Sequence, residues 1–250
     1  MNRKDEKYKI ISNKELGNGY FELKLNAGKI AKFCQPGQFF MIDVEKNFLR
    51  RPLGICDVQV DVISFFYKVV GSGTKNLSNI KSGQIQALGP LGKGYPVEYP
   101  KNLQPLLIAG GTGIASIHFL AKTLKAKGNI YYGVRSKKDL FYLQSLKKFG
   151  WNIVVSTEDG SQGHKGFITE VLEKKIKNTD VLYVCGPTMM LKSILDITAN
   201  KQTKVYASLE QKMSCGFGNC QGCVVKINNE IKSVCKDGPV FEIRNFSNYF

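Results

Sequence analysis

The sequence predicts an N-terminal antiparallel β-barrel over residues 1–100, a parallel-sheet α/β nucleotide-binding domain over 101–210 and a small cysteine-rich segment over 211–250. Three observations support this division. Strand-like runs fill the first hundred residues, strands alternate with helices in the middle of the chain, and four of the seven cysteines lie at or after residue 215. An alternating βα pattern is typical of an open parallel sheet with right-handed crossovers.

The barrel is predicted from β-branched and aromatic runs separated by turns that contain glycine or asparagine. Residues 20–27 alternate apolar and polar side chains with the period of a half-buried strand. Residues 37–44 and 60–70 are continuous apolar runs of strand length. Only residues 74–80 suggest a helix in this part of the chain, so a closed antiparallel barrel is the expected arrangement.

The change of pattern falls at a proline-bearing loop over residues 99–105. Beyond it, strands are predicted at 105–111, 129–136, 152–159, 180–187 and 204–210. Helices are predicted between them, around 117–124 and over 138–150, 166–176 and 188–201. This order places the helices on an open sheet whose ligands bind at the carboxyl ends of the strands.

Composition limits the class of protein. The chain has 250 residues, of which 43% are apolar and 22% charged, as in ordinary globular proteins. No apolar run approaches the ~20 residues of a membrane helix, and the basic N-terminus lacks the apolar core of a signal peptide. We therefore expect no membrane association and a cytoplasmic location, in which thiols stay reduced.

The net charge of +16 admits several partners. Basic surfaces attract nucleic acids, anionic cofactors and acidic proteins. The lysines are scattered, however, and no nucleic-acid-binding motif accompanies them. A lysine-rich solvated surface and an acidic partner or anionic cofactor remain open, and no nucleic-acid partner is expected.

The cysteine segment has the most specific spacing in the chain. Cys215, Cys220, Cys223 and Cys235 follow the pattern C-x4-C-x2-C-x11-C, which is the plant-type arrangement for a [2Fe–2S] cluster. Gly216, Gly218 and Gly222 allow the backbone to curl around a cluster and to direct amide groups at its sulfurs.

A hairpin explains how the fourth cysteine returns to the third. Residues 224–234 contain two strand-like runs joined at Asn228-Asn229, a pair suited to a tight turn. Folding this hairpin brings Cys235 beside Cys223. Zinc remains an alternative, although structural zinc sites usually pair four cysteines as two short knuckles, and a segment without metal is the other alternative.

Two glycine-bearing turns follow predicted strands of the sheet. Gly110, Gly111, Thr112 and Gly113 lie where a strand meets a helix, a place suited to a pyrophosphate. Cys185, Gly186 and Pro187 end another strand of the same sheet. Both turns should therefore face one crevice. Ordinary turns and a buried core thiol are the structural alternatives.

Further candidate ligand-binding residues lie in the barrel. Arg51 is suited to bidentate contact with a phosphate, and Pro52 stiffens the chain beside it. Tyr67 is a candidate for ring stacking, and Gly73 and Thr74 offer a backbone amide and a hydroxyl. Each of these residues, taken alone, also fits an ordinary turn or surface position.

Together these motifs resemble the ferredoxin-reductase superfamily. Within it, the stretches SLEQKMSCGFGNCQGCVVKI and VCKDGPVF, with the order of the domains, closely resemble the electron-transfer subunits of class 1B dihydroorotate dehydrogenases. The resemblance covers essentially the whole chain. It implies three cofactors: FAD, a [2Fe–2S] cluster and NAD.

The resemblance also implies the binding residues. FAD is expected at Arg51, Pro52, Leu53 and Gly54, at Phe66, Tyr67 and Lys68, and at Gly73 and Thr74. NAD is expected at Gly110, Gly111, Thr112, Gly113, Cys185, Gly186 and Pro187, and the cluster at the four cysteines. Gly54 replaces the family's hydroxyl residue and Lys68 its arginine, which loses the planar fork. We expect FAD to bind less tightly for these reasons.

The resemblance implies an FMN-containing dihydroorotate dehydrogenase catalytic subunit as partner, in a heterotetramer with two copies of each chain. That partner would oxidise dihydroorotate in pyrimidine biosynthesis, and this chain would pass the electrons through the cluster and FAD to NAD⁺. No catalytic base is expected here, and His118 and His164 are interpreted as structural or solvent-facing.

Several alternatives stay open. A ferredoxin–NAD(P) reductase-like subunit of another redox complex is the nearest, and a zinc-stabilised module with an empty flavin site is another. Arg135, Lys137 and Lys138 would suit a 2′-phosphate and hence NADP. Glu210 either neighbours the flavin or merely ends a strand.

Overall fold

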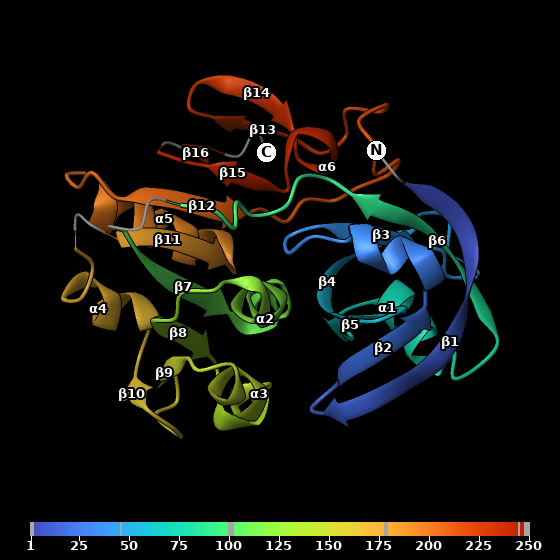
Figure 1. Ribbon diagram of the computed structural model, residues 1–250, viewed down its shortest axis with the longest axis horizontal. Helices are drawn as coiled ribbons and strands as arrows, with labels where there is room; N and C mark the ends of the chain where they lie inside the picture. Colours follow the sequence, from blue (N-terminus) through green and yellow to red (C-terminus); the bar gives the residue numbers. More distant parts are fainter. Residues whose placement is uncertain (1–2, 46, 100–102, 178–179, 245, 248–250) are drawn as a thin grey trace.

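The computed structural model describes residues 3–45, 47–99, 103–177, 180–244 and 246–247. The barrel and the α/β domain lie side by side, and the C-terminal segment lies across one end of both (Figure 1). The fold class predicted from the sequence is confirmed. The predicted boundary at residues 100–101 lies outside the described residues.

The barrel is closed and antiparallel, with strand order β1-β2-β5-β4-β3-β6. Its elements are β1 (Lys4–Gly17), β2 (Tyr20–Asn26), η1 (Gly28–Phe33), β3 (Phe39–Ile42), β4 (Arg51–Gln59), β5 (Val62–Lys68), α1 (Ser72–Asn79) and β6 (Gln84–Leu91). Leu23, Phe40 and Phe65 are fully buried inside it. Their burial accounts for the apolar runs of the sequence.

No strand was predicted before residue 20, yet β1 is the longest strand of the barrel. It pairs with β6 through its first half and with β2 through its second half. Only three of its side chains are buried, those of Tyr8, Ile10 and Asn13. Because so few positions face the core, the apolar alternation that identifies a half-buried strand is nearly absent.

The α/β domain is built on a seven-stranded sheet of order β10-β9-β8-β7-β11-β12-β15. Its strands are β7 (Gln104–Gly110), β8 (Asn129–Val134), β9 (Asn152–Thr157), β10 (His164–Lys165), β11 (Asp180–Cys185), β12 (Lys204–Ser208) and β15 (Val240–Glu242). All neighbours run parallel except β15, which pairs antiparallel to β12. This edge strand comes from the C-terminal segment and was not predicted.

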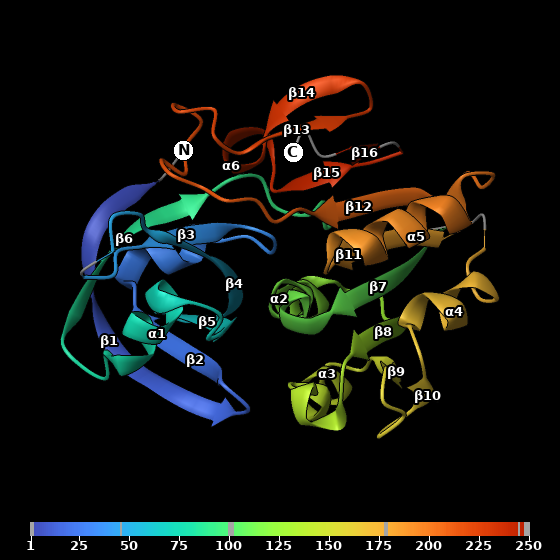
Figure 2. The same ribbon diagram turned by 180° about the vertical axis from the view of Figure 1, so that it is seen from behind.

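Helices cover both faces of this sheet. They are α2 (Ile114–Thr123) and α3 (Leu143–Lys148) on the face toward the barrel, and α4 (Ile168–Glu173) and α5 (Thr188–Thr198) on the other face (Figures 1 and 2). Two short 3₁₀ turns, η2 (Gly111–Gly113) and η3 (Lys137–Asp139), precede α2 and α3.

The helix predicted over 138–150 is wrong in its first half, because regular α-helix begins only at Leu143. Tyr142 adopts a left-handed conformation with φ of 64°, which interrupts the helix. The reason is tertiary contact with the barrel. The Phe141 ring packs against Tyr20, with ring centroids 4.8 Å apart, and the Tyr142 hydroxyl donates a hydrogen bond to Glu22 at 3.2 Å.

The two domains are joined chiefly where α2 lies against β4. Lys122 pairs with Asp57 at 2.6 Å and donates to the Val58 carbonyl oxygen at 2.8 Å. One turn earlier on the helix, His118 donates from Nδ1 to the Cys56 carbonyl oxygen at 2.9 Å. These contacts fix the later turns of α2 against the barrel.

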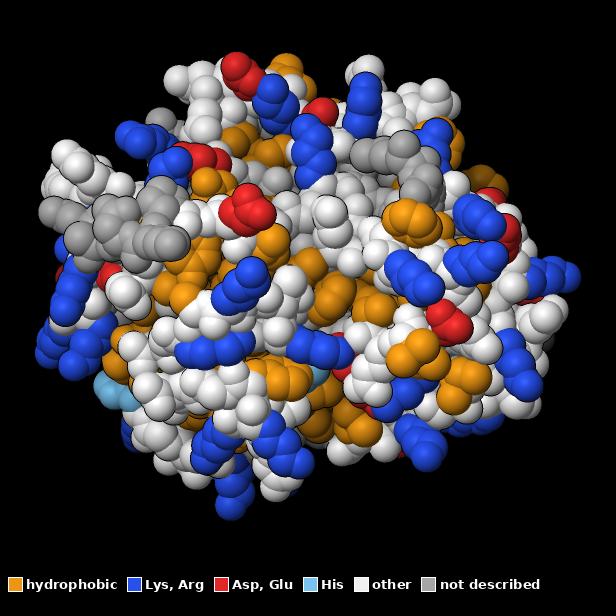
Figure 3. All heavy atoms as spheres, viewed as in Figure 1, with side chains coloured by type: hydrophobic (Ala, Val, Ile, Leu, Met, Phe, Trp, Pro, Cys, Tyr) orange, Lys and Arg blue, Asp and Glu red, His pale blue; other side chains and the backbone are white. Residues whose placement is uncertain are grey.

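The C-terminal segment forms β13 (Val224–Ile227), β14 (Glu230–Ser233), α6 (Val234–Asp237) and β16 (Phe246–Ser247). Asn228 and Asn229 both have positive φ, 49° and 68°, and join β13 to β14 in the predicted tight turn. No helix in the described ranges is long and apolar enough to cross a membrane. Lysine and arginine side chains are scattered over the face in Figure 3 rather than gathered in one patch.

Candidate cofactor site

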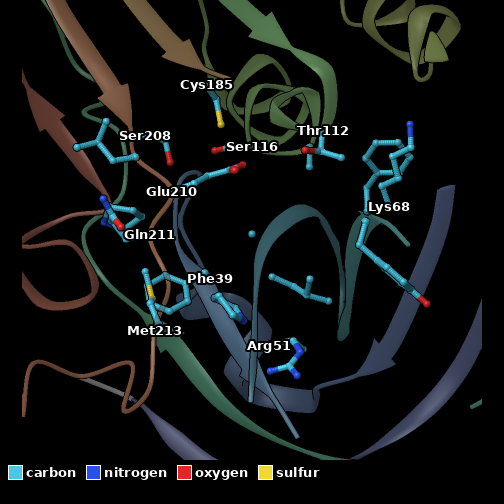
Figure 4. A pocket seen from close by; sticks show the side chains of 18 of the residues that line it. Phe39, Arg51, Lys68, Thr112, Ser116, Cys185, Ser208, Glu210, Gln211 and Met213 are labelled. Carbon is cyan, nitrogen blue, oxygen red and sulfur yellow. The ribbon is translucent and has the colours of Figure 1, made fainter. Parts of the chain in front are cut away.

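A cavity of about 790 Å³ opens between the barrel, the α/β domain and the start of the C-terminal segment. Three walls enclose it (Figure 4). Residues 49–54 and 66–68 form the barrel wall, Thr112, Ala115, Ser116 and Cys185 form the wall of the α/β domain, and residues 208–213 close the third side. Its volume lies within the range of ligand pockets.

Arg51 makes the cationic end of the cavity. Its guanidinium group lies directly on Gly73 in the first turn of α1, where a Cβ atom would come within 1.8 Å of Arg51 Nε. The same group donates to the Leu49 carbonyl oxygen at 2.6 Å and to Asn47 Oδ1 at 3.2 Å. A guanidinium held beside a helix N-terminus is suited to binding a phosphate.

Thr74 orders the turn before α1 rather than projecting freely. Its hydroxyl oxygen accepts a hydrogen bond from the Val70 amide at 2.9 Å, and its hydroxyl donates to the Gly71 carbonyl oxygen at 3.2 Å. Thr74 lines the cavity, whereas Gly73 lies beneath the arginine. Gly73 therefore makes room for the Arg51 guanidinium group at the cationic end of the cavity, and Thr74 orders the turn beside it.

Tyr67 and Lys68 are held by neighbours within the protein. The Tyr67 ring stacks on Phe21, with centroids 5.5 Å apart, and its hydroxyl donates to Asn13 at 2.9 Å. The Lys68 ammonium lies 3.5 Å from Asp139 Oδ1 and 4.4 Å from the centre of the Tyr20 ring. Tyr67 is thus a fixed wall of the cavity, and Lys68 links the barrel to the loop before α3.

The two glycine-bearing turns of the sheet touch one another, as expected for turns that face one crevice. A Cβ atom on Gly113 would lie 2.1 Å from the Cys185 carbonyl oxygen, and one on Gly186 would lie 3.0 Å from backbone atoms of Gly110. These glycines permit close backbone approach. Of the seven residues predicted in the two turns, Thr112 and Cys185 line the cavity.

The two serine side chains that accompany Cys185 were not predicted from the sequence, whereas Glu210 was considered as a neighbour of the flavin. Ser116 from α2 and Ser208 from the end of β12 lie beside it, and Glu210 points into the cavity (Figure 4). Glu210 reaches solvent through the cavity, yet desolvation by the surrounding walls raises its pKa. Burial, followed by the nearby Glu210 carboxylate, raises the pKa of Cys185 to about 12. Isolated serines carry no sequence pattern that would have identified them.

The cysteine loop continues directly from the cavity wall, since Met213 lines the cavity and Cys215 follows two residues later. Gly216 and Gly218 have positive φ, 78° and 89°. A Cβ atom on Gly216 would lie 2.5 Å from Met41, and one on Gly218 would lie 2.6 Å from Lys236. These two glycines let the loop turn tightly against the barrel and α6.

Backbone amide groups of this segment point at sulfur atoms. Cys220 N lies 3.4 Å from Cys215 Sγ, Gly222 N lies 3.5 Å from Cys220 Sγ, and Cys235 N lies 3.4 Å from Cys223 Sγ. Such N–H···S contacts stabilise thiolates. The predicted return of Cys235 to Cys223 is present.

The thiols form two neighbouring pairs. Partial burial raises the pKa of Cys215, but hydrogen bonds from the Cys220 and Phe217 amides outweigh it and lower that pKa to about 6. A hydrogen bond from Cys235 lowers the pKa of Cys223 to about 6, and donating it raises the pKa of Cys235. In the described ranges, no three His, Cys, Asp or Glu side chains converge on one metal ion. Two pairs of cysteine thiols are the donor set of a two-iron cluster.

The remaining candidates lie outside the cavity lining. His118 is buried at the domain joint, and His164 pairs with Glu170 at 2.8 Å on the surface. Both positions agree with the structural interpretation. Arg135, Lys137 and Lys138 are exposed after β8.

Two family profiles match the chain. The iron–sulfur cluster binding domain of dihydroorotate dehydrogenase B matches residues 210–246, and the oxidoreductase NAD-binding domain matches residues 107–196. Two relatives are electron transfer subunits of dihydroorotate dehydrogenase B (NAD(+)). The subunit from Caldanaerobacter subterraneus subsp. tengcongensis is 38% identical over 94% of this chain and 95% of its own length. The subunit from Bacillus velezensis is 39% identical over 93% and 95%.

Solved structures agree on the fold. The NADH-dependent reduced ferredoxin–NADP oxidoreductase superposes with a TM-score of 0.86 and 29% identity, over 96% of this chain and 89% of that one. A ferredoxin–NADP⁺ reductase from Neisseria gonorrhoeae with bound FAD and NADP superposes with a TM-score of 0.68 and 15% identity, over 82% and 98%. At that identity the second similarity concerns the fold alone.

Proposed function

The chain belongs to the family of dihydroorotate dehydrogenase B electron-transfer subunits, and from that premise we propose that it carries electrons from a catalytic partner subunit to NAD⁺. It is an oxidoreductase subunit whose cofactors are FAD, a [2Fe–2S] cluster and NAD. We assign FAD to residues 1–100, NAD to 101–210 and the cluster to 211–250.

The continuity of the cavity wall with the cysteine loop carries this proposal. Residues 209–213 line the cavity, and Cys215 begins the loop whose amides point at sulfur. A flavin in the cavity would therefore lie close to a cluster in the loop. When bound, FAD accepts electrons singly and delivers two together as a hydride, the chemistry that couples an iron–sulfur cluster to a nicotinamide.

The residues of this chain hold the groups in place. Arg51 and the α1 N-terminus bind the pyrophosphate of FAD, and Thr74 orders the turn that supports them. The backbone at Gly54 stays open to the ring, since nothing lies within 4 Å of a Cβ atom built there. The touching turns at Gly110–Gly113 and Cys185–Pro187 receive NAD at the carboxyl end of the sheet.

The cysteines supply the ligands of the cluster. Cys215, Cys220, Cys223 and Cys235 provide four thiolates, and the amides that point at three of them offset negative charge on sulfur. Structural zinc sites usually take four cysteines from two short knuckles, and this segment has one such pair, Cys220 and Cys223. The C-x4-C-x2-C spacing therefore favours the two-iron cluster over zinc.

The partner is a catalytic subunit that carries FMN and oxidises dihydroorotate, with two copies of each chain in the complex. The name of the relatives as electron transfer subunits supports a partner subunit. The mass of the co-purified complex tests the stoichiometry. A mass equal to one copy of each chain would contradict the heterotetramer.

The function is tested on the complex with its partner under anaerobic conditions. Dihydroorotate and NAD⁺ should give NADH, and NADH added to the isolated chain should bleach overlapping flavin and iron–sulfur absorption bands. The same assay with NADP⁺ tests whether Arg135, Lys137 and Lys138 accommodate a 2′-phosphate. A colourless protein that takes up neither flavin nor iron would refute the proposal.

A second candidate function is a ferredoxin–NAD(P) reductase-like subunit of another redox complex. The similarity to the NADH-dependent reduced ferredoxin–NADP oxidoreductase along 96% of the chain favours it. The two functions are distinguished by the electron donor. Bleaching by NADH, together with no response to dihydroorotate in the complex, would support the second.

A further inference from the structure

Ser116 stands out among the residues that line the cavity. It lies in the first turn of α2, is only 6% exposed, and faces the cavity beside Cys185 and Glu210 (Figure 4). Its hydroxyl oxygen makes no hydrogen bond of ordinary geometry to any group of the described chain. A buried hydroxyl without a partner destabilises a folded protein.

The nearest polar groups do not satisfy this hydroxyl. The Tyr95 hydroxyl, which donates to the Val184 carbonyl oxygen at 3.1 Å, lies close by but outside the geometry of a hydrogen bond with Ser116. The other neighbour is the thiol of Cys185, which is only a weak hydrogen-bonding group. Ser116 lines the cavity, so a ligand bound there is placed to pair with its hydroxyl.

The register between β4 and α2 locates the part of the cavity that Ser116 reaches. Lys122 bonds the Val58 carbonyl oxygen, and His118 bonds the Cys56 carbonyl oxygen. Four helical residues thus advance about 6 Å along the joint, as two strand residues do. Gly54, which precedes these carbonyl groups along β4, lines the same cavity as Ser116 in the first turn of α2.

Gly54 offers no side chain to a ligand at this level. Nothing lies within 4 Å of a Cβ atom built on it, so the barrel wall is open backbone here. A planar ligand lying on that backbone would bring a polar edge beside the Ser116 hydroxyl. The position suits the polar edge of the flavin ring.

We propose that Ser116 is a positioning residue for the flavin, forming a hydrogen bond with the polar edge of the isoalloxazine ring from α2, opposite the bare backbone at Gly54. This inference rests on the proposed function. FAD is a better hydrogen-bond partner for Ser116 than NAD, because FAD stays bound throughout turnover. NAD dissociates, which would leave the buried hydroxyl unpaired during part of each turnover.

The test compares Ser116→Ala with Ser156→Ala in the full chain purified with its cofactors. Ser156 is the matched control, since its hydroxyl is also buried without a partner but does not line the cavity. Equilibrium release of FAD is followed by its fluorescence, and the absorption spectrum of the bound flavin is recorded without nucleotide. We expect Ser116→Ala to weaken FAD binding about 2- to 10-fold and to shift the flavin bands, with Ser156→Ala unchanged.

Thermal unfolding of the flavin-free proteins provides a second measurement. Removing an unpaired hydroxyl should leave the unfolding temperature of both variants equal to or above that of the wild type. Unchanged flavin affinity and spectrum in Ser116→Ala, equal losses in both variants, or a loss confined to NAD affinity would overturn the inference. A wild-type chain that binds no FAD would instead overturn the proposed function on which it rests.

Discussion

A side chain at Gly73 and a side chain at Gly54 would interfere with the cavity in different ways. At Gly73 a side chain would occupy the place of the Arg51 guanidinium group, which rests on the backbone of α1. At Gly54 a side chain would enter empty space and meet the ligand itself. The first glycine therefore leaves room for the Arg51 guanidinium group, and the second leaves room for the flavin ring that we propose binds here.

Gly73→Ala should displace Arg51 without disturbing the fold. The added Cβ atom would come within 1.8 Å of Arg51 Nε, and alanine is otherwise favourable in a helix. Loss of a charged hydrogen-bond donor should weaken FAD binding about 10- to 100-fold. Flavin fluorescence during equilibrium release measures the change.

Gly71→Ala is the control in the same turn. Gly71 has an extended conformation with φ of −170°, and nothing lies within 4 Å of a Cβ atom there. Its FAD affinity should equal that of the wild type. Equal losses in the two variants would mean that the turn itself, rather than the placement of Arg51, determines binding.

Residues with a motif could be predicted at this scale, and residues without one could not. Arg51, Gly54 and Cys185 were identified from their motifs, and all three line the cavity. Ser116 and Ser208 were missed, because a single hydroxyl residue has no spacing that marks it. These serines become candidates only because the fold places them in the cavity wall opposite the barrel, and this placement cannot be inferred from the sequence.

At the scale of elements, α2 serves both the cavity and the joint between domains. Its first turn lines the cavity, and its later turns hold β4 through His118 and Lys122. The His118 ring is buried, and its Nε2 atom lies 2.9 Å from Ser145 Oγ. Any change at this joint therefore acts on the cavity wall as well.

His118 should make the joint sensitive to acid. Burial lowers its pKa in the folded chain, against the opposing effects of its hydrogen bond to Cys56 and of Asp57. The unfolded chain, with an imidazole pKa of about 6.5, then binds more protons below that pH. The contribution of neutral His118 to the free energy of unfolding is therefore complete above about pH 6.5 and declines as the pH falls below that value.

His118→Gln removes the titrating group from the joint. The decrease in unfolding temperature between pH 7.5 and pH 5.5 should be smaller in this variant than in the wild type. His164→Gln replaces an exposed histidine and should retain the wild-type decrease. A His118→Gln variant with the same acid response as the wild type would contradict this account.

Elements with a strong apolar period were predicted, and those defined by tertiary contact were not. Most strands and helices of the α/β domain follow the sequence pattern, although the two-residue strand β10 was not predicted. The first half of the helix predicted over 138–150 departs from the pattern, because Phe141 packs on the barrel. In the barrel, β1 was not predicted, because its side chains mostly face solvent. Strand β15 has only three residues, too few for any period.

At the scale of the whole molecule, backbone hydrogen bonds and side-chain packing attach the C-terminal segment to both domains, without a contribution from the cluster. Lys93 N bonds the Gly238 carbonyl oxygen at 2.5 Å, and Leu209 N bonds the Pro239 carbonyl oxygen at 2.9 Å. Strand β15 extends the sheet, and Gly216 packs on Met41 of the barrel. The order of domains was predictable from the sequence, whereas this attachment depends on contacts between distant segments.

Because these contacts attach the C-terminal segment to both domains, loss of the cluster should leave the flavin site intact. Cys235→Ser keeps the size of a side chain that is buried in α6 and removes one thiolate ligand. Iron content and the iron–sulfur absorption should be lost. NADH should still reduce the flavin, while NADH formation from dihydroorotate in the complex should fall to background.

Cys34→Ser is the matched control, since Cys34 lies in the barrel with its thiol 3.7 Å from the Ile30 carbonyl oxygen, away from the cysteine loop. It should keep iron, flavin and both activities. If Cys235→Ser instead lost FAD together with iron, the cluster would be part of the structural support of the cavity. If it kept electron transfer from dihydroorotate to NAD⁺, electrons would have to reach the flavin without passing through the four-cysteine site, which would contradict the route proposed for this subunit.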